Sequence, residues 1–163
     1  YLGTATQMPW ADASMDACIM PELIEHVANW QQCLNEASRV LRHGGVLYLS
    51  TPNKLSPRQD EFNLPLYSWY PAFVKRWCVK KALSSHPQLA NYATYPAVNW
   101  FTYYGLRSAL KERGFDCFDR FDTVNTEGNK AKAAVVGFIR AVPPVRLGAH
   151  ALSKSCQVLA VRR

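Results

Sequence analysis

The sequence lacks any run of apolar residues long enough to cross a lipid bilayer as a helix, which takes about 20 residues. We therefore expect no transmembrane segment within it. It also lacks internal repeats and low-complexity tracts, which argues against stacked-repeat and fibrous architectures. The 163 residues, of which 48% are hydrophobic and 19% charged, instead fit a single globular domain.

Closely spaced pairs of cysteine are absent as well. The five cysteines are odd in number and none forms a C-x-x-C pair, although such pairs are typical of zinc sites and redox motifs. The four histidines show no metal-ligand spacing either, so we predict no metal site. Cysteine in an apolar run usually acts as a small hydrophobic residue, and we predict a reducing, cytoplasmic compartment.

Acidic residues are few: 12 Asp and Glu stand against 19 Lys and Arg, which gives a net charge of +7. Such an excess can attract nucleic acid, an anionic membrane or an acidic substrate. The basic residues are scattered rather than gathered in a stripe, and we predict no nucleic-acid partner. On a helix expected over residues 72–83, Lys81 falls between Trp77 and Val74, which makes a poor amphipathic pattern for a membrane surface.

A strand–helix–strand pattern fills the first third of the chain. Residues 15–20 form a short apolar run, typical of a strand buried on both faces. Apolar residues from Leu23 to Leu41 recur at steps of three and four and predict a helix, which Asn29 could cap again after a break near Val27. Gly44-Gly45 would end this helix, and residues 46–51 form the next strand. This order predicts a βαβ unit with parallel strands.

The regular pattern fails between residues 54 and 98, a stretch rich in proline, tryptophan and tyrosine. We interpret it as an insertion at the carboxyl edge of the sheet that contains one helix, because long loops in compact domains are often lids or binding loops. The elements expected beyond it are a helix from Thr102 to Arg113, a strand over 115–122, a helix over 126–141 that ends at Pro143-Pro144, and a final strand over 157–161.

Four motifs, taken in order, give the chain a family resemblance. They read Met8-Pro9-Trp10-Ala11-Asp12-Ala13-Ser14-Met15-Asp16, Glu22-Leu23-Ile24-Glu25-His26-Val27, Arg39-Val40-Leu41-Arg42-His43-Gly44-Gly45 and Thr51-Pro52-Asn53. At this spacing the chain resembles class I S-adenosylmethionine-dependent methyltransferases, especially the small-molecule branch that includes the ubiquinone-biosynthesis O-methyltransferases. The stretch from Leu106 to Phe115 also resembles the family's entry to its sixth strand. The resemblance covers residues 1–53 well and 100–163 loosely.

The resemblance implies an α/β fold with a Rossmann-like sheet that is present from its fourth strand onward. Residues 1–163 would form a single partial domain, with residues 54–98 as a substrate-binding lid. The family's glycine-rich first loop and the acidic end of its second strand are absent. We expect both to lie upstream of Tyr1, where the sequence opens without methionine. The implied cofactor is S-adenosyl-L-methionine, and the implied reaction is methyl transfer to a small-molecule acceptor.

The cofactor residues follow from the same resemblance. In open α/β sheets, ligands bind beyond the carboxyl ends of the strands. Here that places Met20, Pro21 and Glu22 beside the cofactor. Thr4 and Ala5 occupy the position that follows the family's third strand, where an aspartate often binds the adenine amino group. Thr4 can accept a hydrogen bond but brings no charge, which leaves this contact open.

Two polar side chains follow the strand ends as candidates for chemistry. His26 could act as a general base on an acceptor hydroxyl, since the pKa of a free imidazole lies near neutrality. Alternatively, His26 only packs beside the sheet while Glu22 and Glu25 complement a helix N-terminus. Asn53 could orient the substrate, or it could be an ordinary turn residue after Pro52.

The aromatic insertion is the candidate substrate pocket. Tyr67, Trp69 and Tyr70 could wall an apolar site, or they could simply pack the insertion onto the sheet. Methyl transfer asks little of side chains, because the sulfonium donor is already activated and positioning supplies much of the rate. Two other functions stay open: a non-catalytic methyltransferase-like scaffold that binds a partner, and an unrelated nucleotide-dependent α/β enzyme. Oligomeric state does not follow from the sequence.

Overall fold

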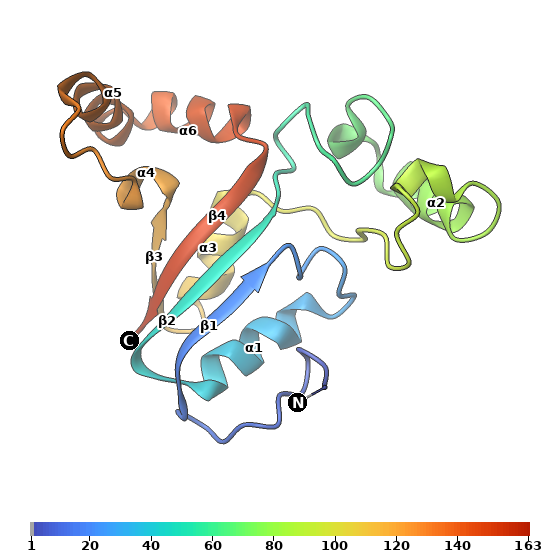
Figure 1. Ribbon diagram of the computed structural model, residues 1–163, viewed down its shortest axis with the longest axis horizontal. Coiled ribbons are helices and arrows are strands. Elements are labelled where there is room, and N and C mark those ends of the chain that lie inside the picture. Colours follow the sequence, from blue (N-terminus) through green and yellow to red (C-terminus); the bar gives the residue numbers. More distant parts are fainter. Residues whose placement is uncertain (1) are drawn as a thin grey trace.

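A computed structural model describes residues 2–163. Its single sheet has four strands in the order β1-β2-β4-β3 (Figure 1). β1 and β2 are parallel, as the βαβ pattern predicts, whereas β4 is antiparallel to both of its neighbours. The last strand of the chain therefore lies between β2 and β3. The strands are β1 (Met15–Pro21), β2 (Leu41–Pro52), β3 (Phe115–Asp119) and β4 (Ser155–Arg162).

Helix α1 (Trp30–Val40) begins later than the apolar pattern predicts. Asn29 caps it by accepting a hydrogen bond from the amide of Gln32, as its position after a break near Val27 suggests. Residues 22–29 form turns instead of helix, so the prediction of a helix from Leu23 is wrong. The reason is that backbone carbonyls in these turns accept hydrogen bonds from residues far along the chain.

The connection from α1 into β2 contains the predicted glycine stop. Gly44 has a φ of +76°, a left-handed conformation that glycine adopts without steric penalty. The extended structure of β2 nevertheless begins at Leu41, five residues before the predicted start at Val46. Its pairing with β1 is irregular in this part: Met15 pairs with Leu41, and Ala17 already pairs with Val46.

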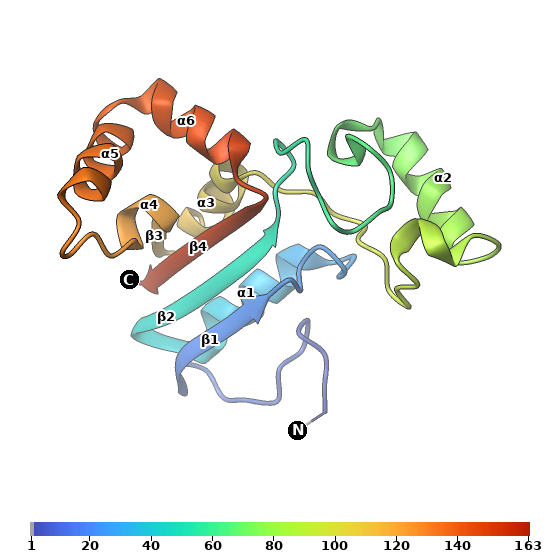
Figure 2. The ribbon, with the colours of Figure 1, turned by 45° about the horizontal axis from the view of Figure 1, so that its top comes forward.

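The main core lies on one face of the sheet, under α1 and helix α3 (Tyr103–Lys111). Both helices lie on the same side of the strands in Figures 1 and 2. Thr102 caps α3 through a hydrogen bond from the amide of Gly105, as predicted. Fully buried side chains from the helices and strands meet there: Leu34, Ala37, Leu47, Leu49, Leu106, Leu110, Phe115, Val158 and Ala160.

The opposite face of the sheet is largely uncovered: among the described residues, only the short helix over residues 120–123 borders Tyr48 and Leu159 on it. Ile19, Tyr48, Leu159 and Phe118 stand directly opposite one another across the four strands. Ile19 is 70% exposed and Phe118 is 41% exposed. The prediction that residues 15–20 form a strand buried on both faces is therefore wrong. β1 is an edge strand, and only the face toward α1 is covered.

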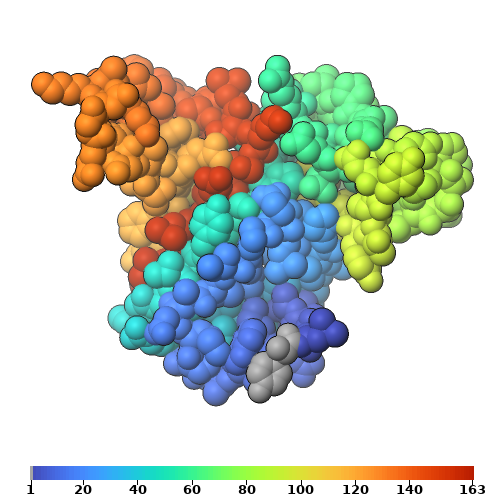
Figure 3. Space-filling model, viewed as in Figure 1, coloured from blue at the N-terminus to red at the C-terminus, as the bar shows by residue number. Residues whose placement is uncertain are grey.

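The segment of residues 54–98 leaves the sheet at the end of β2 and forms a separate lobe, coloured green in Figures 1 and 3. It contains two short 3-10 turns, Tyr67–Trp69 and Pro87–Ala90. Helix α2 (Ala72–Ala82) ends one residue before the predicted limit. The lobe has a small core of its own, made of Phe62, Tyr67, Cys78, Ala82 and Ala90.

Three further helices connect β3 to β4: α4 (Arg120–Thr123), α5 (Lys130–Ala141) and α6 (Pro143–Leu152). β3 ends at Asp119, because this residue caps α4, so the predicted strand over 115–122 is too long. Helix α6 was not predicted; proline is tolerated in the first turn of a helix, where its missing N–H would be unpaired anyway. Within residues 2–163, no helix combines the length and apolar character that crossing a membrane requires.

Candidate functional site

A sharp turn at Glu22 carries the chain away from the carboxyl end of β1. Glu22 has a φ of +46°, which is uncommon for a residue with a side chain. Its amide donates to the carbonyl oxygen of Ser50 over 2.9 Å. The Ser50 hydroxyl donates in return to the Glu22 carboxylate over 2.6 Å. These two bonds fix the start of the 22–29 loop against β2.

Asn99 holds the rest of this loop from the far end of the insertion. Its side-chain Nδ2 donates to the carbonyls of Ile24, over 3.0 Å, and Val27, over 2.7 Å. The backbone amides of Val98 and Asn99 both donate to the carbonyl of Glu25, over 2.8 and 3.0 Å. Four hydrogen bonds therefore join the loop to the segment that leads from the insertion back into α3.

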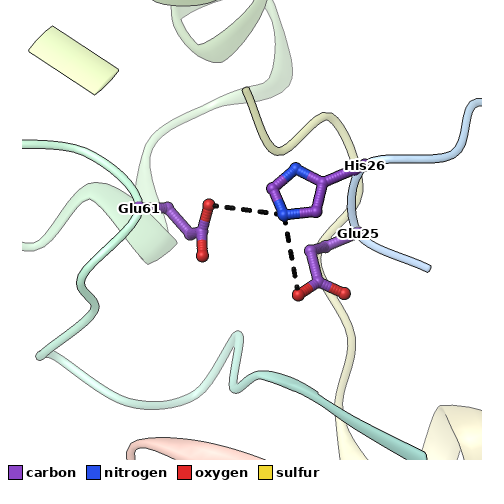
Figure 4. Close-up of side chains that lie close together, drawn as sticks. All are labelled: Glu25, His26 and Glu61. Carbon is purple, nitrogen blue, oxygen red and sulfur yellow. Dashed lines mark ion pairs between the residues drawn. The ribbon is translucent and has the colours of Figure 1, made fainter. Parts of the chain in front are cut away.

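The loop presents His26 between two carboxyl groups (Figure 4). The imidazole Nε2 lies 3.9 Å from Oε1 of Glu25 and 4.0 Å from Oε2 of Glu61. One ligand atom from each of the three side chains lies within 4.8 Å of the others. Glu61 comes from the insertion, and nothing in the sequence pattern singles it out. The fold alone brings it to His26.

Glu25 is the buried member of this cluster. Its side chain is fully inaccessible, and neither carboxyl oxygen has a hydrogen-bond partner among the described residues. Burial raises the pKa of Glu25 to about 8, and the nearby Glu22 carboxylate adds to the rise. Burial also raises the pKa of Glu61. Carboxyl groups perturbed in this way, beside an imidazole, are typical of functional sites.

The chemistry open to the cluster is proton transfer or cation binding. The His26 side chain is 27% exposed, so a ligand can reach Nε2, whereas its Nδ1 is buried without a partner in the described part of the chain. The carboxyl group of Glu61, and that of Glu25 when it is ionised, would stabilise an imidazolium formed there. Two carboxylates and one imidazole are also ligands that divalent transition metals accept. The prediction of no metal site rests on spacing in the sequence and does not cover this arrangement.

The predicted cofactor residues Thr4, Ala5 and Met20 line one cavity of about 430 Å³ beside β1. The Thr4 hydroxyl is already bonded within its own turn, to the Thr6 hydroxyl over 2.9 Å and to the Thr6 amide over 3.3 Å. Pro21 and Glu22 lie at the end of β1, beyond the lining of this cavity.

The lining is largely apolar and contains no ionisable side chain apart from Cys18. It fits a ring system such as adenine. The described residues around it offer nothing for the charged amino-acid end of S-adenosylmethionine.

The structure corrects the prediction for Asn53. The residue is 2% exposed, and its side-chain amide donates to the carbonyls of His150, over 2.7 Å, and Ser153, over 2.8 Å. Its Oδ1 accepts from the amide of Leu55 over 3.0 Å. Both the Nδ2 and the Oδ1 of the side chain are thus bonded to backbone groups. Asn53 ties the end of β2 to the end of α6 and has no group left to orient a substrate.

The three predicted aromatic residues of the lid separate into different environments. Tyr67 is fully buried and stacks on Phe62 with ring centroids 4.1 Å apart, so it packs the lobe and does not wall a pocket. Trp69 is 58% exposed, and its indole N–H donates to the carbonyl of Leu55 over 3.2 Å. Tyr70 alone of the three lines a cavity, together with Trp100.

Comparison with known sequences gives these features a family. The sequence model described as "Methyltransferase domain" matches residues 1–49. A probable S-adenosylmethionine-dependent methyltransferase of Mycolicibacterium smegmatis is 42% identical over 60 residues, which cover 36% of this chain and 23% of the relative. A demethylmenaquinone methyltransferase of Tropheryma whipplei is 32% identical over 112 residues, which cover 69% and 45%. The chain spans less than half the length of these relatives.

Solved structures agree in fold. An S-adenosylmethionine-dependent methyltransferase from Mesorhizobium loti superposes with a TM-score of 0.55 at 14% identity, over 98% of this chain and 67% of that one. A methyltransferase from Thermotoga maritima, described as a possible histamine N-methyltransferase, gives 0.52 at 18% identity, over 99% and 62%. At such identities the likeness concerns the fold alone. Together with the sequence matches, this likeness confirms the resemblance seen in residues 8–53: the first 49 residues match a methyltransferase-domain model, and the chain is similar to S-adenosylmethionine-dependent methyltransferases in sequence and in fold.

Proposed function

We propose that the protein carrying this chain transfers a methyl group from S-adenosylmethionine to a small-molecule acceptor, and that His26 accepts the acceptor's proton. The observation that supports this most directly is the placement of His26 Nε2, 3.9 Å from Glu25 and 4.0 Å from Glu61, just beyond the carboxyl end of β1. That end of an open α/β sheet is where ligands bind.

The residues on the cofactor side would bind and position the cofactor without taking part in the chemistry. When bound, S-adenosylmethionine would supply an electrophilic methyl group on its sulfonium, and neutral S-adenosylhomocysteine would be the leaving group. Ala5 and Met20 would pack against its ring, and Pro21 with Glu22 would form the boundary toward the acceptor. The two hydrogen bonds between Glu22 and Ser50 keep this boundary in place. Precise placement of the two reactants supplies much of the rate in such a reaction.

The residues on the acceptor side handle the proton. His26 takes it at Nε2 as the acceptor atom attacks the methyl group, a contribution that is typically about 10²–10⁴-fold in rate. The carboxyl group of Glu61, and that of Glu25 when it is ionised, stabilise the resulting charge on the ring. The insertion that brings Glu61 to the site also shields it from water, as lids commonly do. We propose residues 54–98 as this lid within a single domain.

A small-molecule acceptor is supported by one relative, whose name states demethylmenaquinone as its substrate. A cytoplasmic location is supported by the five cysteines, all of which are free. The scattered positive charge supports neither a nucleic-acid partner nor a specific oligomer.

The runner-up is a scaffold that has the fold and binds a partner without catalysis. The observation that favours it is the Thr4 position, where the hydroxyl is used within its own turn and no charge faces the cavity.

Calorimetry of the full-length protein with S-adenosylmethionine separates the two proposals. We expect saturable binding, and acceptor-dependent formation of S-adenosylhomocysteine when extracts of small molecules are supplied. Absence of cofactor binding by the full-length protein would refute methyl transfer and leave the scaffold. If the cofactor binds, mass spectrometry of ligands that the protein retains during purification would identify the acceptor.

A further inference from the structure

A second cavity, of about 610 Å³, lies between the insertion and the segment that leads into α3. Its walls come from helix α2 and the preceding Tyr70, from Lys54 just beyond the end of β2, from Ala28 and from residues 97–100. This last segment is the one whose amides bind the carbonyl of Glu25. The cavity is therefore joined through a few hydrogen bonds to the loop that carries His26.

The charge of this cavity is of one sign. Lys54, Lys75 and Arg76 line it, and no carboxylate does. In the part of the chain that the structure describes, none of these three cations takes part in an ion pair. The sequence around them agrees, because residues 62–111 contain neither Asp nor Glu. Cations this close together, without counter-charges, favour an anion from outside.

Lys75 is held in place before any ligand arrives. Its Nζ lies 4.4 Å from the centroid of the Trp100 ring and donates to the carbonyl of Ser68 over 2.7 Å. An ammonium has three donors, so two remain for a ligand. Burial lowers the pKa of Lys75 to about 8, and repulsion by Lys54 adds to the effect. The entry of an anion would relieve both penalties.

The remaining walls are apolar or aromatic. Tyr70 and Trp100 supply rings, and Val79, Ala97 and Val98 supply aliphatic surface. An ion with no apolar part, such as free phosphate, would leave this surface unused. We propose that the cavity binds the acceptor of the methyl transfer through an anionic group, a carboxylate or a phosphate monoester, carried on an aromatic or otherwise apolar body. The identification of the ligand as the methyl acceptor rests on the proposed function, whereas the binding of an anion in the cavity does not.

The geometry gives the anionic end a fixed place. Charge-assisted hydrogen bonds from Lys75 would hold it. The loop from Ile24 to Val27, tied to the cavity wall by Asn99, carries the proton-accepting His26 nearby. An acceptor anchored at Lys75 would thereby have its other end directed by the same wall that positions the base.

The test measures binding of benzoate, phenyl phosphate and neutral benzamide to the full-length protein by NMR titration, without S-adenosylmethionine. We expect both anions to bind, and benzamide to bind about tenfold or more weakly, the difference that loss of a charge-assisted hydrogen bond produces. Lys75→Met should reduce benzoate affinity to the level of benzamide. Lys80→Met is the matched control, because Lys80 lies on the same helix, is exposed and does not line the cavity.

Circular dichroism of each variant shows whether it folds, and Lys54→Met provides a second removal of charge at a site that is exposed. Equal affinities for benzoate and benzamide would overturn the inference, as would unchanged benzoate binding in both Lys75→Met and Lys54→Met. Anion binding without any cofactor binding would retain the cavity assignment and refute the proposed function. Cofactor binding without anion binding would do the reverse.

Discussion

The imidazole Nε2 of His26 lies 3.9 Å from Oε1 of Glu25, the residue that precedes it in the chain. One side chain is partly exposed and the other is fully buried. Because burial raises the pKa of Glu25 to about 8, its carboxyl group is largely protonated at neutral pH.

His26→Ala should reduce the methyl-transfer rate of the full-length protein by about 10²–10⁴-fold, the usual contribution of a general base. The affinity for S-adenosylmethionine should stay within about twofold, because the imidazole faces the acceptor. The measurement is kcat with calorimetry of the cofactor on the same sample. His43→Ala is the control, since His43 is exposed in the irregular start of β2. A similar loss in both variants would show that His26 has no chemical role.

Glu25→Gln should flatten the dependence of stability on pH. The folded pKa of Glu25 lies near 8, above its ordinary value of 4.5. A carboxyl group of this kind stabilises the fold below pH 4.5, and the contribution is lost as pH rises through 8. The expected loss between pH 5 and pH 8 is on the order of 3 kcal/mol in the wild type. Urea unfolding at both pH values should show this decrease in the free energy of unfolding for the wild type but not for the variant.

Asp119→Asn should destabilise the C-terminal helices. Asp119 is 1% exposed, accepts hydrogen bonds from His150 over 2.7 Å and Arg146 over 2.8 Å, and caps α4. Removing the charge weakens the hydrogen bonds from His150 and Arg146 and leaves Arg146 paired only with the partly exposed Asp122, which costs about 3 kcal/mol. Thermal unfolding should show the loss. Asp16→Asn, at an exposed ion pair with Arg42, should change stability by less than about 1 kcal/mol.

Acid should act on the same network. Burial alone would raise the pKa of Asp119, but hydrogen bonds from His150 and Arg146 outweigh it and lower the pKa to about 2. A carboxylate with a depressed pKa contributes stability above its ordinary pKa of 3.8, and the contribution disappears as pH falls through 2. The midpoint temperature of thermal unfolding should therefore fall more steeply between pH 4 and pH 2 in the wild type than in Asp119→Asn.

Local chemistry explains which parts of the fold could be predicted from the sequence. Asn29 and Thr102 act as helix caps because capping depends on neighbouring residues. Glu61 and Asn99 could not be assigned, since their contacts with the loop of His26 depend on the path of an insertion without periodic pattern. Asn53 was predicted as a substrate ligand for a similar reason: the carbonyls that occupy it belong to residues about a hundred positions later.

The placement of the last strand illustrates the same limit. The sequence predicts a final strand over residues 157–161, and β4 confirms it. The position of β4 between β2 and β3, antiparallel to both, depends on the packing of the whole sheet against its helices. A local sequence pattern does not contain that information. Likewise, the exposure of Ile19 depends on what covers the sheet and not on the apolar run itself. A hydrophobic pattern shows which side chains of a segment could be buried, whereas the elements packed against the segment determine which of them are buried.

Binding of benzoate should weaken as pH rises through about 8. Lys75 carries the pKa of about 8, and Lys54 and Arg76 are the other charges that line the cavity. Tyr70 also lines it, and the Tyr67 ring lies 5.7 Å from the Lys75 Nζ. The pKa of Tyr67 is raised by burial, so it stays neutral throughout this range. As the Lys75 ammonium loses its proton, it loses the charge that attracts the ligand. The affinity for benzoate should fall about tenfold per pH unit between pH 8.5 and pH 10, provided that Lys75 alone controls it. In Lys75→Arg the guanidinium keeps its charge, and the affinity should stay constant over the same interval. An equal decline in Lys75→Arg would assign the titration to another group and remove Lys75 from the anion site.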